Sequence, residues 1–256
     1  MNQDDRADLV SHLDELRTRI LRSAAYLCVT ATLAACYFRP IYRFIAHPIL
    51  SGAKAAGGRF NVPGVLEPFM LRLWVAVLGG LVLALPFIYL EVWGFVRPGL
   101  TPRERRAVAP LAPCSSLLFA AGVALAYLIA DPCVRWMLSL RPPGTDALLS
   151  LNDTVVLFLK FYITCGIGFQ LPIVMILLSS LGLVSSRVFT RFWREATVGI
   201  FIVVAIITPT WDPITMTVAA LPMVLLYLGT ISIIKVIERR RRRRAAEEEK
   251  ALGSRS

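Results

Sequence analysis

Long apolar runs separated by short polar segments dominate this sequence. The runs lie at 20–38, 70–96, 109–130, 155–181, 196–208 and 214–236. Most of them reach or approach the ~20 residues with which an α-helix crosses the hydrocarbon core of a bilayer, and the last does so with Pro222 inside it. We therefore expect an all-α membrane protein with six transmembrane helices, folded as a single domain over residues 1–236.

The fifth run is unusually short. At 1.5 Å per residue, residues 196–208 would make a helix of only ~20 Å, against a hydrocarbon core of ~30 Å. Either the helix includes Trp193 and Arg194 at its cytoplasmic end, or the bilayer thins around it. We interpret 196–236 as a tight hairpin of two helices that turns at 208–213, because one bent helix would place two prolines and an aspartate at membrane depth.

Composition and charge support this interpretation and add a topology. The chain is 56% hydrophobic with a mean hydropathy of +0.64, whereas a soluble domain has roughly 45–50% apolar residues. Of its 28 Lys and Arg residues, 20 fall in segments on the N-terminal side of the six-helix arrangement. The positive-inside rule therefore predicts that the N and C termini are both cytoplasmic.

The net charge of +11 does not indicate a nucleic-acid-binding protein. The basic residues lie in short loops beside the membrane and in the run 239–244, with no soluble domain to present them to a nucleic acid. We expect these residues to set the topology and to attract anionic lipids. The charged tail at 237–256 is expected to be disordered and cytoplasmic.

No pattern in the sequence indicates catalysis, a metal or a cofactor. The two histidines, His12 and His47, lie on opposite sides of the expected membrane, and there is no HExxH, GxSxG or glycine-rich phosphate loop. A secondary transporter is a stronger alternative function than an enzyme. The polar residues that could lie at membrane depth in such a protein are Lys160, Gln170 and Glu91. Three polar groups do not make an ion pathway, and the hydropathy shows no inverted repeat.

Two acidic residues have positions that suggest a binding role. Glu15 lies in the polar segment before the first run, and Glu104 lies in the short loop after the second, so both are expected to face the cytoplasm. A carboxylate held at a membrane entry point is a candidate docking site for a cation. The alternative is an ordinary local ion pair, such as Glu15 with Arg19 one helical turn away.

Several strings together resemble the TatC family, the receptor subunits of the twin-arginine protein translocase. They are HLDELRTR before the first run, Pro48 in the first external loop, VWGFVRPGLTPRERR after the second run, and ITPTWDPIT followed by LPM in the last hairpin. The strings occur in the expected order, on the expected sides, over nearly the whole chain.

The resemblance implies a six-helix, concave scaffold in the bacterial cytoplasmic (inner) membrane. Its cytoplasmic face would bind the paired arginines of the signal peptides of folded proteins, with Glu15 and Glu104 as the contacts. A guanidinium pairs with a carboxylate through two parallel hydrogen bonds that lysine cannot copy, so a requirement for two arginines is chemically reasonable. Export would use the transmembrane proton gradient, and no bond would be made or broken by this chain.

The resemblance also implies roles for other residues. Arg17 would orient the N-terminal segment of the signal-binding site, and Phe95 would lie beside that site unless it only packs at the membrane interface. On the far side, Pro48 would fix the external loop, and Asp212 would cap the sixth helix ahead of Pro213.

Two residues depart from the pattern of many TatC proteins. Gln170 stands where many relatives carry glutamate, and Met216 replaces a polar glutamine of some relatives. Glutamine keeps its hydrogen-bonding capacity but cannot take part in protonation. We expect single-span partners of the TatA and TatB type to dock along the fifth and sixth helices at Gln170, Thr208 and Met216, and we expect several copies of this chain in the receptor complex.

Overall fold

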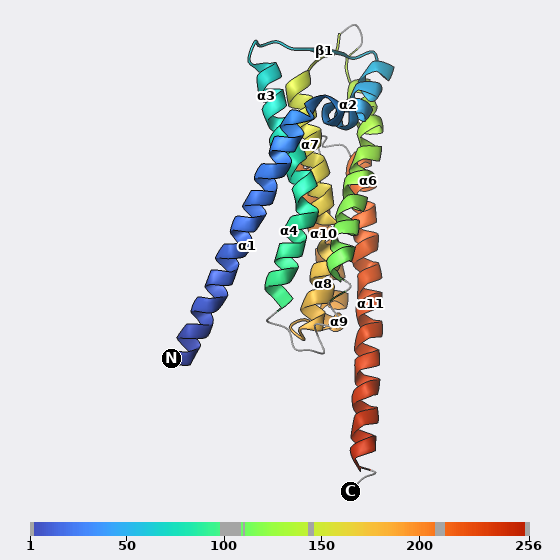
Figure 1. The fold of residues 1–256 in the computed structure, drawn as a ribbon. Coiled ribbons are helices and arrows are strands. Elements are labelled where there is room, and N and C mark those ends of the chain that lie inside the picture. The colour runs from blue at the N-terminus through green and yellow to red at the C-terminus, as the bar shows by residue number, and fades with distance from the viewer. Residues whose placement is uncertain (1–2, 98–108, 110, 143–145, 208–212, 254–256) are drawn as a thin grey trace.

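A bundle of long helices, roughly parallel to one another, forms the body of the protein (Figure 1). The structure is a computed structural model, and it describes residues 3–97, 109, 111–142, 146–207 and 213–253. The helices are α1 (Gln3–Cys36), α2 (Phe38–Ala55), α3 (Glu67–Trp74), the π-helical turn η1 (Val75–Gly79), α4 (Gly80–Val96), α6 (Leu111–Ser139), α7 (Leu151–Gly168), α8 (Leu171–Ser180), α9 (Ser186–Arg191), α10 (Trp193–Ile207) and α11 (Pro213–Gly253).

Five helical segments of the described chain are long and apolar enough to cross a membrane. They are Leu13–Cys36, Glu67–Val96, Leu111–Ser139, Leu151–Ser180 and Met216–Arg239, which correspond to five of the six expected runs. The remaining run corresponds to α10, whose 15 residues make a helix of about 22 Å. This length is shorter than a hydrocarbon core of ~30 Å, as the short run at 196–208 predicts.

The first helix begins well before its apolar part. It runs without a break from Gln3 to Cys36, so the polar string that contains Glu15 belongs to the same rigid element as the first membrane span. This helix leans away from the bundle toward its N-terminal end (Figure 1). Close contact with the rest of the bundle occurs at Gly80 of α4, where an added Cβ would lie 2.5 Å from the Cα of Ala31.

At one end of the bundle lies a cap that the sequence analysis did not predict. It contains α2, which lies across the ends of the long helices, and a two-stranded parallel sheet of β1 (Arg59–Asn61) and β2 (Leu148–Ser150) (Figure 1). In the sheet, Arg59 pairs with Leu148 and Asn61 with Ser150. The strands hold together two segments that are far apart in the chain, and they satisfy backbone groups that would otherwise need water.

Two of the expected spans are interrupted helices. The second consists of α3, η1 and α4 in succession, and the fourth divides into α7 and α8 at Phe169 and Gln170. Pro172 explains the second interruption, because it has no N–H to continue the hydrogen bonding of α7 and is tolerated in the first turn of a new helix.

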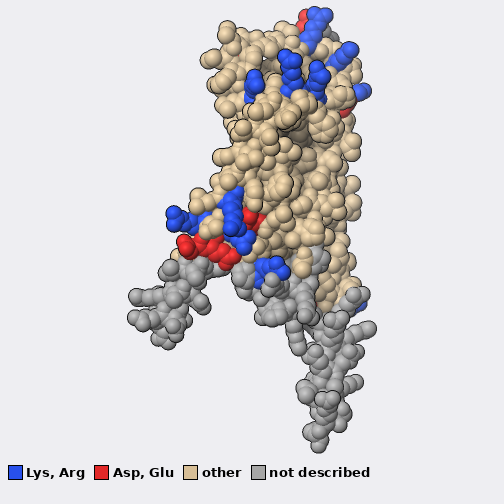
Figure 2. Space-filling view, viewed as in Figure 1, with Lys and Arg blue, Asp and Glu red and all other residues tan. Residues whose placement is uncertain are grey.

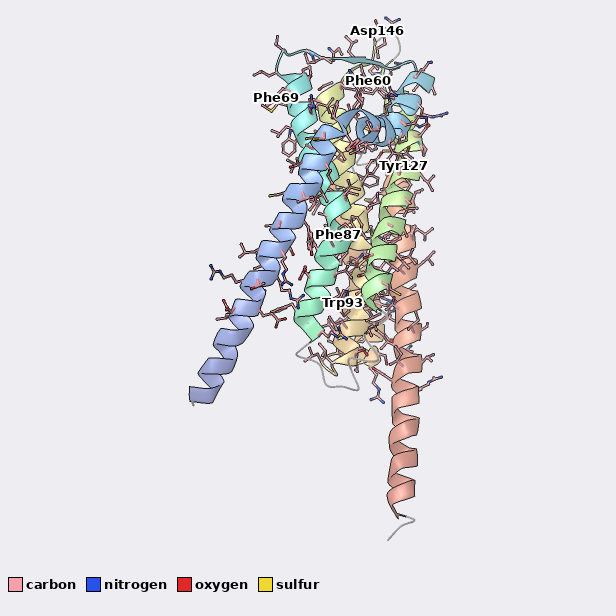
Figure 3. The ribbon with its side chains drawn as sticks, in the orientation of Figure 1. Phe60, Phe69, Phe87, Trp93, Tyr127 and Asp146 are labelled. Carbon is pink, nitrogen blue, oxygen red and sulfur yellow. The ribbon has the colours of Figure 1, made fainter. Side chains whose placement is uncertain are left out.

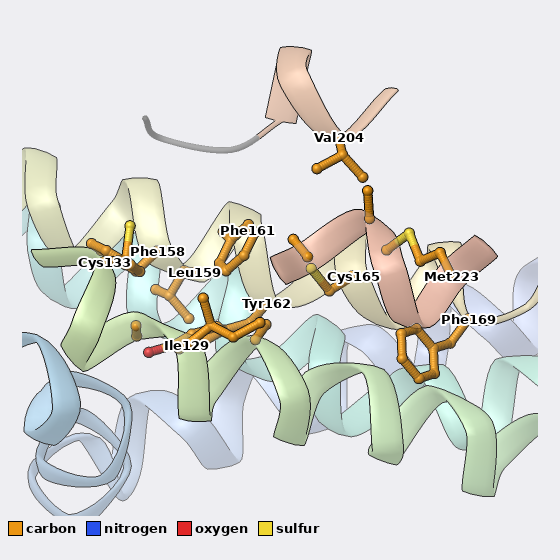
Figure 4. Packing of buried hydrophobic residues seen from close by; sticks show 14 of the residues in the cluster. Ile129, Cys133, Phe158, Leu159, Phe161, Tyr162, Cys165, Phe169, Val204 and Met223 are labelled. Atoms are coloured by element: carbon orange, nitrogen blue, oxygen red, sulfur yellow. The ribbon is translucent and has the colours of Figure 1, made fainter. Parts of the chain in front are cut away.

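The hydrophobic core is centred on α7. In an apolar 18-residue stretch of the span formed by α7 and α8, 61% of the residues are buried. In the corresponding stretch of α1 the share is 6%. Phe158, Leu159 and Phe161 of α7 are almost fully buried, and they pack with residues of α6, α10 and α11 (Figure 4). The helix α7 is therefore the central support of the bundle, whereas α1 is held mainly through its contacts with α4 and η1.

The opposite end of the bundle holds both termini, α9 and the end of α11 (Figure 1). The Ser186 backbone N–H and hydroxyl donate hydrogen bonds to the two carboxylate oxygens of Glu238, at 2.7 and 2.6 Å, so α9 is fixed against α11. The helix α11 continues to Gly253, whereas we expected a disordered tail at 237–256. Its Arg, Ala, Glu and Lys residues are good helix formers, which gives a physical reason for this extension.

We expect opposite effects from placing alanine at two helical glycines. A Cβ at Gly122 of α6 would lie 2.7 Å from the Cys165 carbonyl oxygen of α7, whereas a Cβ at Gly199 of α10 would meet nothing within 4 Å. Gly122→Ala should therefore destabilise the protein by about 1–3 kcal/mol through overpacking. Gly199→Ala should be neutral or stabilise it by up to about 1 kcal/mol, because alanine favours the helix.

Thermal unfolding of the two purified variants in the same detergent measures this difference. If Gly122→Ala unfolds at the temperature of the unchanged protein, then α6 and α7 do not approach as closely as described.

Candidate functional site

Charged side chains gather where α1 passes α4, near the end of the bundle that holds both termini (Figure 2). This group includes Glu15 and Arg19 from α1 and Glu91 from α4. The surface between this group and the cap is almost entirely uncharged in the view of Figure 2. The group therefore lies at one edge of the apolar belt.

Arg19 forms the centre of this group, because its guanidinium bridges two carboxylates. Its Nη1 donates to Glu91 Oε2 at 2.8 Å, and its Nη2 donates to Glu15 Oε1 at 3.1 Å. The Tyr26 hydroxyl lies 3.4 Å from Glu91 Oε1, at the long end of hydrogen bonding. One arginine therefore makes two ion pairs, one within α1 with Glu15 and one that joins α1 to α4 through Glu91.

The sequence of α1 explains half of this arrangement. Glu15 precedes Arg19 by four residues, which places the two side chains one turn apart on the same face of the helix with the acid on the N-terminal side. Tyr26 follows Arg19 by seven residues and so lies on that face as well. Its ring lies 5.7 Å from that of Phe87, between centroids, so the contact with α4 continues along the helix (Figure 3).

A glycine on α4 makes room for the guanidinium. A Cβ at Gly94 would lie 2.1 Å from Nη1 of Arg19, so a larger residue here would push the guanidinium out of its present position. Gly94 and Glu91 are three residues apart, so they share a face of α4. The Arg19 guanidinium thus lies against α4 at a position without a side chain while it pairs with Glu91.

The three charged groups differ in exposure, and their charges do not balance. The side chain of Glu91 is 10% exposed, that of Arg19 26%, and that of Glu15 33%. Glu91 needs its partner, because an unpaired charge at this depth is costly. Two carboxylates and one guanidinium carry a net charge of −1, and the more exposed carboxylate is Glu15.

The other residues predicted for the signal-binding site occupy different positions. Phe95 lies one turn beyond Glu91 on α4 and is partly buried. Arg17 is exposed and lies about 200° around α1 from Glu15, so it faces away from α4. Glu104 lies outside the described residues, and so the expected pairing of Glu15 with Glu104 is not described either.

Gln170 lies inside the bundle. It is 9% exposed, and its Nε2 donates to the Ser115 carbonyl oxygen of α6 at 2.9 Å. The Ser115 hydroxyl in turn accepts a hydrogen bond from Trp93 Nε1 of α4 at 3.2 Å. This short polar chain connects α4, α6 and α8 behind the group formed by Glu15, Arg19 and Glu91.

Met216 lies in the first turns of α11, beside a groove that it shares with α10. The groove has a volume of about 260 Å³ and is lined by Met216 together with Thr197, Val198, Phe201, Ile202 and Ala205. Thr208, the third residue expected to contact partners, lies outside the described residues.

Of the two residues expected to have structural roles on the far side, Pro48 and Asp212, the structure describes one. Pro48 lies within α2 on its buried face, between Ile45 and Ile49, and its carbonyl oxygen accepts a hydrogen bond from the Ser51 hydroxyl at 3.1 Å. Asp212 lies outside the described residues.

Sequence reasoning identified Glu15 and its local partner Arg19, but it missed the pairing of Arg19 with Glu91. Glu91 was considered only as part of an ion pathway. The available signal was a lone acid near the end of an apolar run, since such a residue requires a cationic partner on a neighbouring helix. Gly94 gave no signal, because its role depends on the packing of α1 against α4.

Comparisons with known proteins agree with the family resemblance. The family model "Sec-independent protein translocase protein (TatC)" matches residues 11–245. The chain is 32% identical to the Sec-independent protein translocase protein TatC of Deinococcus radiodurans, over 86% of this chain and 83% of that one. It is 33% identical to the chloroplastic TATC of Arabidopsis thaliana, over 92% of this chain and 68% of that one.

Solved structures are similar as well. A crystal structure of the twin-arginine translocase receptor TatC in DDM superposes with a TM-score of 0.76 at 27% sequence identity, and the match covers 87% of this chain and 99% of that one. Together with the membrane-spanning helices, these matches place the chain among the multi-pass proteins of the bacterial inner membrane, as a component of Sec-independent protein translocation. The chain belongs to the TatC family of Sec-independent protein translocase proteins.

Proposed function

We propose that this chain is the receptor subunit of a twin-arginine translocase and that Glu15 binds one guanidinium of the paired arginines in a signal peptide. The observation that carries the proposal is that Glu15 already accepts a guanidinium, that of Arg19, through only one of its oxygens. Among the described residues its Oε2 accepts no hydrogen bond, and its side chain is one-third exposed. A second guanidinium can therefore reach Glu15 from the solvent side.

The electrostatics of the site favour a cation. The group of Glu15, Arg19 and Glu91 carries a net charge of −1, at the edge of an apolar belt where charge is poorly screened. Arginine fits this site better than lysine, because its planar fork pairs with a carboxylate through two hydrogen bonds. Glu104 would supply the second acid, for the second arginine of the signal.

Six membrane crossings with cytoplasmic termini complete the proposal. The N and C termini lie at the same end of the bundle (Figure 1), which requires an even number of crossings. The five longer spans then need α10 as a sixth, with local thinning of the bilayer around it. The excess of Lys and Arg in the segments at this end supports a cytoplasmic position for Glu15.

The groove between α10 and α11 supports a docking site for partner proteins. Single-span partners of the TatA and TatB type would dock along these two helices, beside the groove at Met216 and at Thr208. Gln170 would act indirectly, because its amide is engaged with α6. Several copies would assemble, anionic lipids would bind the run at 239–244, and export of folded cargo would draw on the proton gradient.

Replacing the proposed contact acids tests signal binding. Glu15→Gln and Glu104→Gln should each weaken binding of a twin-arginine signal peptide by about tenfold or more, because each removes a charge-assisted pair. Asp14→Asn is the matched control, since Asp14 is an exposed acid on the same turn of α1. Binding is measured with a labelled peptide and purified full-length protein, and unchanged affinity in the double variant would reject the assignment.

The topology is tested by labelling cysteines introduced into a cysteine-free variant. Val62→Cys and Thr210→Cys should react with a membrane-impermeant maleimide in intact spheroplasts. Leu183→Cys, between α8 and α9, should react only after permeabilisation. Protection of Thr210→Cys in intact spheroplasts would show that α10 does not cross the membrane.

A further inference from the structure

Arg19 of the chain itself already pairs with Glu15, the carboxylate that we assign to binding of the signal peptide. We propose that Arg19 is an internal competitor for the guanidinium of the signal, and that Glu91 retains Arg19 when the signal takes over Glu15. This inference rests on the proposed function, because it concerns the same carboxylate. It gives Glu91 and Arg19 roles in tuning signal affinity without requiring either to contact the signal.

The two ion pairs of Arg19 are unequal, and the difference sets the direction of the exchange. The pair with Glu91 is the shorter, at 2.8 Å, and involves a carboxylate that is 10% exposed. The pair with Glu15 is 3.1 Å long and involves a carboxylate that is 33% exposed. Ion pairs strengthen as water is excluded, so an arriving cation displaces Arg19 from Glu15 and not from Glu91.

The position of the guanidinium allows this exchange without a large movement. Nη1 lies over Gly94 and pairs with Glu91, while the separate nitrogen Nη2 pairs with Glu15. Releasing Nη2 therefore leaves the other ion pair in place. The Tyr26 hydroxyl lies near the second oxygen of Glu91, which holds that carboxylate toward α1.

Charge neutralisation explains why Glu91 is needed. With Glu91 present, Arg19 and Glu91 neutralise each other, and the negative charge of Glu15 remains available to the signal. Without the charge of Glu91, Arg19 pairs with Glu15 alone, and the two form a neutral site with no net attraction for a cation. Removing Arg19 has the opposite effect, because both carboxylates then lack an internal cation.

The competing explanation is that Arg19 only fastens α1 to α4. In that case any substitution that breaks the bridge would misplace Glu15 and weaken signal binding. The exchange predicts effects of opposite sign for the two partners of one ion pair. Equilibrium binding of a signal peptide to the two single variants and the double variant therefore separates the two explanations.

The experiment measures the Kd of a fluorescent twin-arginine signal peptide for the purified full-length protein and for Glu91→Gln, Arg19→Gln and the double variant. We expect Glu91→Gln to weaken binding by about tenfold and Arg19→Gln to tighten it by about threefold or more. In the double variant, binding should recover to that of the unchanged protein or better. Arg22→Gln is the matched control for loss of a positive charge, since Arg22 is exposed on the same helix.

Two results would overturn the exchange. The first is weaker binding by Arg19→Gln, and the second is a double variant that binds no better than Glu91→Gln. Thermal unfolding of each variant shows whether the fold is retained, and a loss of binding that follows a loss of stability supports the fastening role. Glu15→Gln, measured in parallel, separates the two proposals. If this variant binds the signal peptide normally, the proposed function fails. If it binds weakly and the double variant binds no better than Glu91→Gln, only the exchange fails.

Discussion

The pairing of Glu91 with Arg19 is the interaction on which the proposed site depends. A carboxylate that is 10% exposed near the end of a membrane-spanning helix requires a cation, and α1 supplies one. This pairing joins α4 to a helix of which few residues are buried. It also fixes the position along the bundle axis at which Glu15, one turn from Arg19 on the same helix, is exposed to solvent.

The rest of the fold positions this pair. The helix α7 forms the buried centre, and the hydrogen bonds from Trp93 through Ser115 to Gln170 connect α4 to α6 and to the start of α8. The small residues Gly80 and Gly94 let α1 approach α4 closely at two levels. A rigid α4 therefore presents Glu91 to a helix that leans outward, and the side chain of Glu15 on that helix is one-third exposed.

Much of this architecture could be predicted from the sequence, because long apolar runs in a bilayer have almost no alternative to helices. The six runs predicted six spans, of which five correspond to long apolar helices and one to the short α10. The helix α2 was missed because its apolar positions do not form a continuous run, and the parallel pairing of β1 with β2 was missed because three-residue strands carry no periodic signal. Glu15 was found through its motif, whereas the pairing of Glu91 with Arg19 depends on the packing of two helices more than 70 residues apart in the chain.

The central claim is that a signal guanidinium binds Glu15 while Arg19 stays with Glu91. A high-resolution cryo-electron microscopy structure of the full-length protein bound to a twin-arginine signal peptide tests it most directly. The account predicts a peptide guanidinium within hydrogen-bonding distance of Glu15, with Arg19 still paired with Glu91 and separated from Glu15. A peptide bound away from Glu15, or an Arg19 that has left Glu91, would contradict it.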